Sequence, residues 1–257
     1  MRVLNFRDEV IGGIARKMGF DPTADLPPDL AATYVTFINS WLRKLWSRLD
    51  WPESVLIEQR TPASHYIPWA QTSQNVIDRA FKVFLVDPRA VDAPSDVPFR
   101  LDSGGVFCGF EHGTNVWLKY LPEPPFFTTA VWSATVTYAK YAGTADKTLS
   151  VVYDPVTGWN YQSLQATNLN HAITDGAWWS QLAFPADNGD LIVHGAYADA
   201  LREDGQTDKA LAEEQALIGE LEHKIASRIL APYDPLTDQA VPAARYRAPG
   251  LQTAATK

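Results

Sequence analysis

Two hydrophobic periodicities occupy separate blocks of this chain, and their order is the strongest constraint on its fold. Apolar residues recur with helical spacing from Leu30 to Leu49, and Pro52 ends that pattern. Short segments with strand-like alternation follow, and helical spacing returns only after Pro185. We therefore expect helices contributed by both ends of the chain, with a β-rich excursion between them.

The N-terminal block predicts two helices. Asn5 can cap a short helix from Arg7 to Met18, and Gly19 ends it. A longer helix follows the entry segment Asp25-Leu26-Pro27-Pro28, since proline is tolerated in a first turn.

The segment 53–128 predicts a small antiparallel sheet. Its alternating stretches cover residues 55–60, 80–86, 99–101, 106–110 and 116–120. Gly104-Gly105 and residues 112–115 are expected to form hairpin turns between them.

The segment 129–182 is poor in charge and rich in tryptophan and tyrosine. A unit of this size buries little aliphatic surface, so large aromatic side chains can be its core. Exposed aromatic rings can instead stack on sugar rings, and both alternatives stay open here. The candidates for glycan stacking are Trp159, Trp178 and Trp179.

The C-terminal block predicts an αα-hairpin. One helix is capped by Asp187 or Asn188 and the next runs from Thr207 to Ile229, with Gly205 in the link. Leu211, Ile218 and Ile225 fall seven residues apart. We expect five side chains to bury against one another: Trp41, Leu45, Leu201, Leu211 and Ile218.

These patterns together predict an α+β fold. It is a helical bundle of N- and C-terminal helices with a β-rich excursion and an inserted small β module. The predicted units are helices in 1–52, the β module 53–128, the aromatic module 129–182, the helical hairpin 183–230 and an extended tail 231–257.

Composition and motifs predict no enzyme, no cofactor and no metal site. The chain has one cysteine, Cys108, which excludes an internal disulfide and suits a buried small hydrophobe. No nucleophile elbow, P-loop, HExxH or dinucleotide motif is present. The carboxylate pairs Glu213-Glu214 and Glu220-x-Glu222 are expected on a solvated helix face balanced by Lys209 and Lys224.

The start of the chain and its hydropathy predict neither secretion nor a membrane span. Arg7, Asp8 and Glu9 interrupt any signal-peptide core. No stretch reaches about 20 apolar residues, so we expect no membrane partner.

The aromatic module resembles the small chitin-binding type of carbohydrate-binding domain. The resemblance rests on Trp132, Tyr138, Val152-Tyr153, Tyr161 and Trp178-Trp179, and the chain departs from the pattern by extra residues at 141–149 and 168–174. It implies a small β fold and raises carbohydrate binding as an alternative function.

A second resemblance covers residues 24–128 and 183–230 and points to the head-to-tail adaptor (head-completion, or tail-tube-collar) proteins of tailed bacteriophages. It rests on Leu49-Asp50-Trp51-Pro52-Glu53, on Val116–Tyr120 leading into Pro122-Glu123-Pro124-Pro125, and on Ala196–Gln206 followed by Lys209-Ala210. The resemblance implies a virion protein at the head-to-tail interface. It implies a homo-oligomeric ring, typically dodecameric, that contacts the portal protein and the tail or nozzle proteins.

The charge and the tail agree with this expectation. The net charge is −8, which disfavours tight binding to DNA phosphates and suits a channel that genome DNA passes without sequence-specific binding. Residues 231–257 have four prolines and no periodicity. We expect this tail to contact the portal through Arg245, Tyr246 and Arg247, because arginine and tyrosine are favoured at such contacts.

Overall fold

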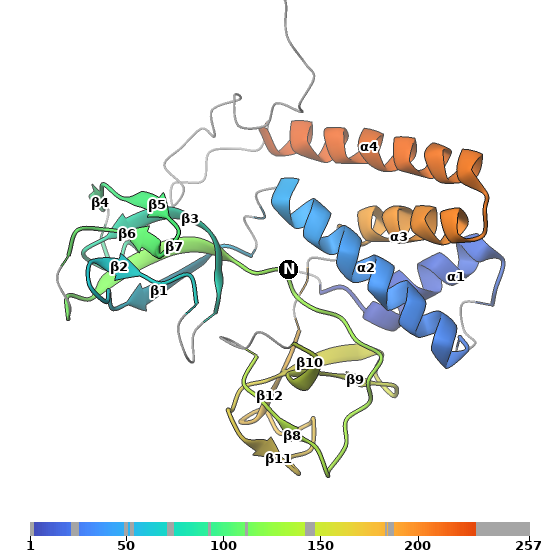
Figure 1. The fold of residues 1–257 in the computed structure, drawn as a ribbon, viewed down its shortest axis with the longest axis horizontal. Helices are drawn as coiled ribbons and strands as arrows, with labels where there is room; N and C mark the ends of the chain where they lie inside the picture. The colour runs from blue at the N-terminus through green and yellow to red at the C-terminus, as the bar shows by residue number, and fades with distance from the viewer. Residues whose placement is uncertain are drawn as a thin grey trace, which may run out of the picture.

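The computed structural model describes residues 3–21, 26–48, 51, 54–70, 75–91, 94–110, 113–141, 147–182, 184 and 188–229. Within these residues the helices, the sheets of strands β1–β7 and the sheets of strands β8–β12 form three groups (Figure 1). The tail residues Arg245, Tyr246 and Arg247 lie outside the described residues.

The helical elements follow the sequence pattern closely. A π-helical turn capped by the Asn5 side chain leads directly into α1, which ends at Gly19 in the left-handed conformation. The elements are η1 (Phe6–Ile11), α1 (Gly12–Met18), α2 (Pro28–Arg48), α3 (Gly189–Glu203) and α4 (Thr207–Ile229), with a short 3₁₀ turn η3 (Lys147–Leu149).

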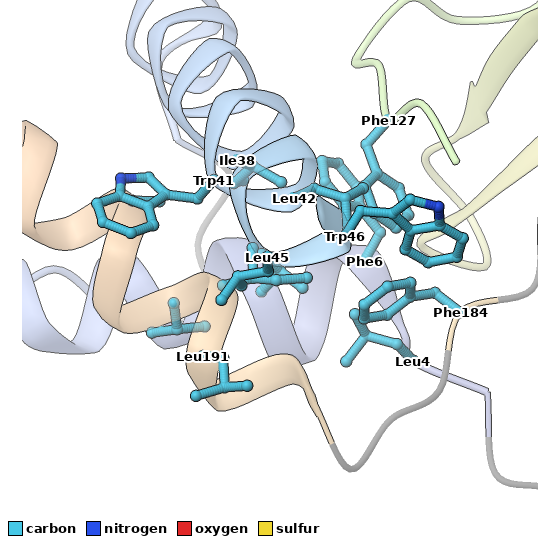
Figure 2. Close-up of a cluster of buried hydrophobic side chains, with 14 of the residues drawn as sticks. Leu4, Phe6, Ile38, Trp41, Leu42, Leu45, Trp46, Phe127, Phe184 and Leu191 are labelled. Atoms are coloured by element: carbon cyan, nitrogen blue, oxygen red, sulfur yellow. The ribbon is translucent and has the colours of Figure 1, made fainter. Parts of the chain in front are cut away.

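One large core joins α2 and α3 to segments that are not helical. Trp46 and Phe184 lie in this core (Figure 2), and Trp51 is buried with them, its ring centroid 5.5 Å from that of Trp46. Phe6 stacks on Phe127 at 4.9 Å, so the chain between the two β regions is held against the N-terminus. Aromatic pairs at these separations add to the stabilisation from burial.

The prediction of a helical bundle as the basis of the fold is wrong. The described residues form a mixed α/β structure, with helices α1–α4 and twelve strands in four sheets. The physical reason lies in the main core, where non-helical residues such as Leu121, Phe127 and Phe184 are as fully buried as the helix side chains. The helices therefore cover strands and loops as well as one another.

The first β group has two antiparallel sheets around a second core. The larger sheet has the order β1-β7-β3-β4, from β1 (Leu56–Arg60), β7 (Val116–Pro122), β3 (Ile77–Phe84) and β4 (Asp96–Val97). The smaller has the order β2-β6-β5, from β2 (Tyr66–Ile67), β6 (Gly105–Phe107) and β5 (Arg100–Asp102). The Gly104-Gly105 turn joins β5 and β6 as predicted. The hairpin predicted at 112–115 is wrong, because β6 and β7 belong to different sheets.

The second β group is formed by the segment 129–182, which is rich in tryptophan and tyrosine. We call it the aromatic group. Its sheets have the orders β12-β10-β9 and β11-β8. The strands are β8 (Thr137–Tyr138), β9 (Val151–Asp154), β10 (Trp159–Ser163), β11 (Asn168–Leu169) and β12 (Trp179–Gln181). Tyr138, Val152 and Trp179 are its buried centre, so aromatic residues do supply much of this small core.

The predicted burial of the seven-residue repeat in α4 is wrong. Trp41, Leu45 and Leu201 are buried, but Leu211 is 48% exposed and Ile218 is 45% exposed. The buried face of α4 is offset by one residue and consists of Ala210, Leu217 and Leu221. Successive residues of an α-helix are rotated by about 100° about its axis. A shift of one residue therefore turns Leu211 and Ile218 away from α3 and turns Ala210 and Leu217 toward it.

Candidate functional site

The three tryptophans predicted to stack on glycans have different environments. Trp179 is 2% exposed, and its indole N–H donates a hydrogen bond to the carbonyl of His171 at 2.8 Å. Both ring faces are therefore inside the small core. Trp159 and Trp178 are half-buried.

The strand register separates Trp159 from Trp178. Trp159 begins β10 opposite Asp154, whereas the other end of β10, at Ser163, lies opposite Trp179. A strand rises about 3.3 Å per residue, so the two half-buried indoles lie at opposite ends of β10. The structure does not bring the three tryptophans together as one stacking surface.

Trp178 forms an aromatic pair that the sequence pattern did not identify. Its ring stacks on the His171 ring with centroids 3.5 Å apart and planes 8° apart. The two residues are brought together by the loop between β11 and β12. This pair is a planar surface of the kind that sugars and bases contact.

A stripe on α4 is the clearest unpartnered apolar surface among the described residues. Leu211 and Ile218 are two helical turns apart and both are nearly half exposed. Ile225, seven residues further on, packs instead against the main core and is not part of this surface. We call Leu211 and Ile218 the α4 stripe.

Ionic contacts fix the orientation of α4, so the α4 stripe is held outward. Glu213 accepts hydrogen bonds from Lys17 Nζ at 3.0 Å and lies 2.6 Å from His194 Nδ1. Glu214 pairs with Arg202 of α3. Glu213 and Glu214, which were predicted on a solvated face, thus join α4 to α1 and α3. Lys224 pairs with Glu220 within α4 at 3.0 Å.

The electrostatics of Glu213 reflect these contacts. Partial burial alone would raise the pKa of the carboxyl group. The hydrogen bonds from Lys17 and His194 outweigh that effect, so the pKa of Glu213 lies below its usual value. The carboxylate is therefore held ionised where the three helices meet.

A second surface of interest is the row of exposed cations on α2. Arg43, Lys44 and Arg48 are exposed along its C-terminal half. Lys44 lies 4.0 Å from the centroid of the Trp41 ring. On α4, Asp208 and Glu222 are exposed close to the α4 stripe, and Lys209 is exposed on the same helix.

The described residues provide little for covalent or metal chemistry. Cys108 is 6% exposed, its thiol lies 3.5 Å from the His65 carbonyl, and burial raises the pKa of the thiol. This confirms the expectation of a buried, small apolar side chain. In the described part of the chain, histidine, cysteine and carboxylate side chains form no group of three able to hold a metal ion.

None of the described helices is long and apolar enough to cross a bilayer. No family model, no curated protein and no solved structure matches this chain.

Proposed function

We propose that this protein is a structural adaptor of a tailed-phage virion. Copies of the chain form a ring, of dodecameric order, that joins the portal to the tail or nozzle proteins and surrounds the DNA channel. The resemblance of residues 24–128 and 183–230 to head-to-tail adaptors supports this proposal. An adaptor needs no catalytic group, and it needs a surface through which copies associate.

The α4 stripe is the observation on which the proposal rests. Leu211 and Ile218 expose large apolar side chains at 48% and 45%, although the buried face of α4 is already formed by other residues. Aligned exposed apolar residues rimmed by charges mark protein–protein contacts. In a closed ring, each copy offers one surface to its left neighbour and a different one to its right neighbour.

Opposite charges support α2 as the neighbour's contacting surface in the proposed ring. The α4 stripe is flanked by the carboxylates Asp208 and Glu222, and α2 exposes Arg43 and Arg48. A contact between α4 of one copy and α2 of the next pairs these charges around the apolar centre. Complementary charges of this kind favour the correct register between partners.

The net charge of −8 suits the channel role. Each phosphate contact made by lysine or arginine holds DNA electrostatically, and a protein with excess negative charge limits such contacts. Genome DNA then passes the ring without being retained. The proposal therefore assigns no DNA-binding site to this chain.

The experiment is assembly with the cognate portal protein, measured by mass photometry. Wild-type protein is expected to add to the portal as one complete ring. The double variant Leu211→Glu, Ile218→Glu is expected to bind in substoichiometric amounts while its thermal unfolding stays close to wild type, because both residues are exposed. Val156→Glu is the matched control, because Val156 is an apolar residue that is 84% exposed in the turn between β9 and β10.

Two results would overturn the proposal. One is a wild-type protein that never associates with the portal at any ratio. The other is a double variant that assembles as completely as the Val156→Glu control.

The alternative function is carbohydrate binding directed at a host cell-wall or surface glycan. The observation that favours it is the stack of Trp178 on His171, which is half exposed at the surface of the aromatic group. A ring with many copies would make even weak sugar binding effective through avidity.

A further inference from the structure

A cavity of about 540 Å³ lies between the larger sheet of the first β group and the aromatic group. Strand β1, Trp117 of β7 and Asn75 line one side, and residues 140–141 and 162–164 line the other. The volume lies within the range of small-molecule sites in proteins. No residue of this cavity belongs to the α4 stripe or to the predicted tryptophan set.

The sheet side of the cavity combines an indole with an amide. Gln59 lies directly opposite Trp117 in the β1–β7 ladder. Their side chains point away from the core that Val116, Leu118 and Tyr120 fill, because strand residues alternate between faces. The Arg89 guanidinium lies 5.1 Å from the Trp117 ring centroid and covers part of the indole outside the cavity lining.

Glu58 alternates with Gln59 along β1, so its carboxylate lies on the core face of the sheet, where a buried network holds it. Arg60, whose side chain is fully buried, donates to Glu58 Oε2 at 2.9 Å, and the Tyr120 hydroxyl donates to the same oxygen at 2.7 Å. Burial raises the pKa of Tyr120, so its hydroxyl keeps its proton. Glu58 therefore supports the sheet from the core side, and Gln59 and Trp117 are the side chains that β1 and β7 present on the opposite face.

The opposite wall supplies an amide and a cation. The Gln162 side-chain nitrogen donates to Ser180 Oγ at 3.0 Å, which fixes the amide plane. Lys140 has no ion-pair partner among the residues that the structure describes. Because Arg60 already neutralises Glu58, Lys140 leaves the cavity with a surplus positive charge.

We propose that this cavity binds a carboxylated sugar, with a uronic-acid disaccharide as the simplest ligand. The ring face of the sugar packs on Trp117, its hydroxyl groups bond to the amides of Gln59 and Gln162, and its carboxylate pairs with Lys140. Aromatic and amide side chains together match a polyhydroxylated ring, and the lysine selects an anionic one. This site goes beyond the adaptor function and does not depend on it.

Isothermal titration of the full-length protein with digalacturonic acid tests the site. Cellobiose is the neutral sugar control, and inorganic phosphate is the anion control. Wild-type protein is expected to bind digalacturonic acid at about millimolar Kd or better, and more tightly than either control. Lys140→Gln should weaken digalacturonic acid binding about tenfold, to the level of cellobiose, because a charge-assisted hydrogen bond is lost.

Two further variants locate the binding. Gln162→Ala should weaken both sugars, whereas Trp178→Ala, in the other aromatic pair, should leave them unchanged. The proposal is overturned if digalacturonic acid gives no heat up to about 10 mM. It is also overturned if phosphate binds equally well, or if Trp178→Ala weakens binding as much as Lys140→Gln does.

Discussion

Trp41 of α2 lies against the backbone of Gly195 in α3, so closely that a Cβ on that glycine would stand 2.6 Å from the indole Cγ. One turn further along α3, Asp199 accepts a hydrogen bond from the same indole at 2.7 Å. The two helices can therefore approach closely only because residue 195 has no side chain. This contact orients α2 on α3 and so positions the surfaces that we assign to ring contacts.

Gly195→Ala is expected to destabilise the protein by about 1–3 kcal/mol, because the added methyl group overpacks the contact with Trp41. Gly219→Ala is the matched control on α4, where a Cβ would meet nothing within 4 Å. That substitution should stabilise the protein by about 0.5–1 kcal/mol through helix propensity. Urea unfolding of the three proteins checks both signs, and a neutral Gly195→Ala would refute the close approach.

The pH dependence of the free energy of unfolding should reveal how much the ionic contacts of Glu213 stabilise the fold. The pKa of Glu213 is lowered in the folded state, so its ionised form stabilises the fold above the unfolded-state pKa near 4. This contribution is lost as the pH falls through the lower, folded-state pKa. Glu213→Gln should therefore cost about 1 kcal/mol at pH 7 and progressively less at acidic pH.

Glu222→Gln is the control for this experiment, because Glu222 is exposed on the same helix. Chemical unfolding at a series of pH values gives the difference in free energy between each variant and wild type. A Glu213→Gln effect that is constant from neutral to strongly acidic pH would contradict the proposed ionic contacts.

Local patterns predicted single elements well, and long-range pairing was where they failed. The stripe from Leu30 onward located α2, and the alternation at 116–120 located β7. The pairing of β1 with β7 joins residues about sixty positions apart, and no local pattern specifies it. The four-sheet arrangement therefore could not be obtained from periodicity.

The sequence also identified candidate residues, but it could not show whether their side chains are exposed. Periodicity marked Leu211 and Ile218, but their rotation relative to α3 depends on the contacts of Glu213 and Glu214 with other helices. The cavity beside Lys140 was missed because its lining comes from distant segments of two β groups. The local indication in the sequence was a lysine within an aromatic, charge-poor segment.

Substitutions of the three tryptophans distinguish the alternative function, glycan binding, from a purely structural role of the aromatic group. Trp178→Ala should leave folding nearly intact and remove any fluorescence change on titration with chito-oligosaccharide. Trp179→Ala should cost about 3–5 kcal/mol, because that ring is buried. If wild-type fluorescence does not change with any such fragment, and virions assemble normally with Trp159→Ser, the aromatic group is structural only.

Removal of residues 233–257 tests the predicted portal-binding tail. We expect the truncated protein to melt as wild type does and to lose attachment to the portal. The triple variant Arg245→Ala, Tyr246→Ala, Arg247→Ala should reproduce that loss. Truncated protein that still enters particles would exclude this tail as the anchor.

The adaptor proposal is tested most directly by locating the protein in the virion. Electron microscopy of particles carrying a gold-labelled antibody against this chain is the measurement. The proposal predicts label at the junction between head and tail, in one cluster per particle. Label along the tail or at its distal end, or particles that lack the protein altogether, would contradict it.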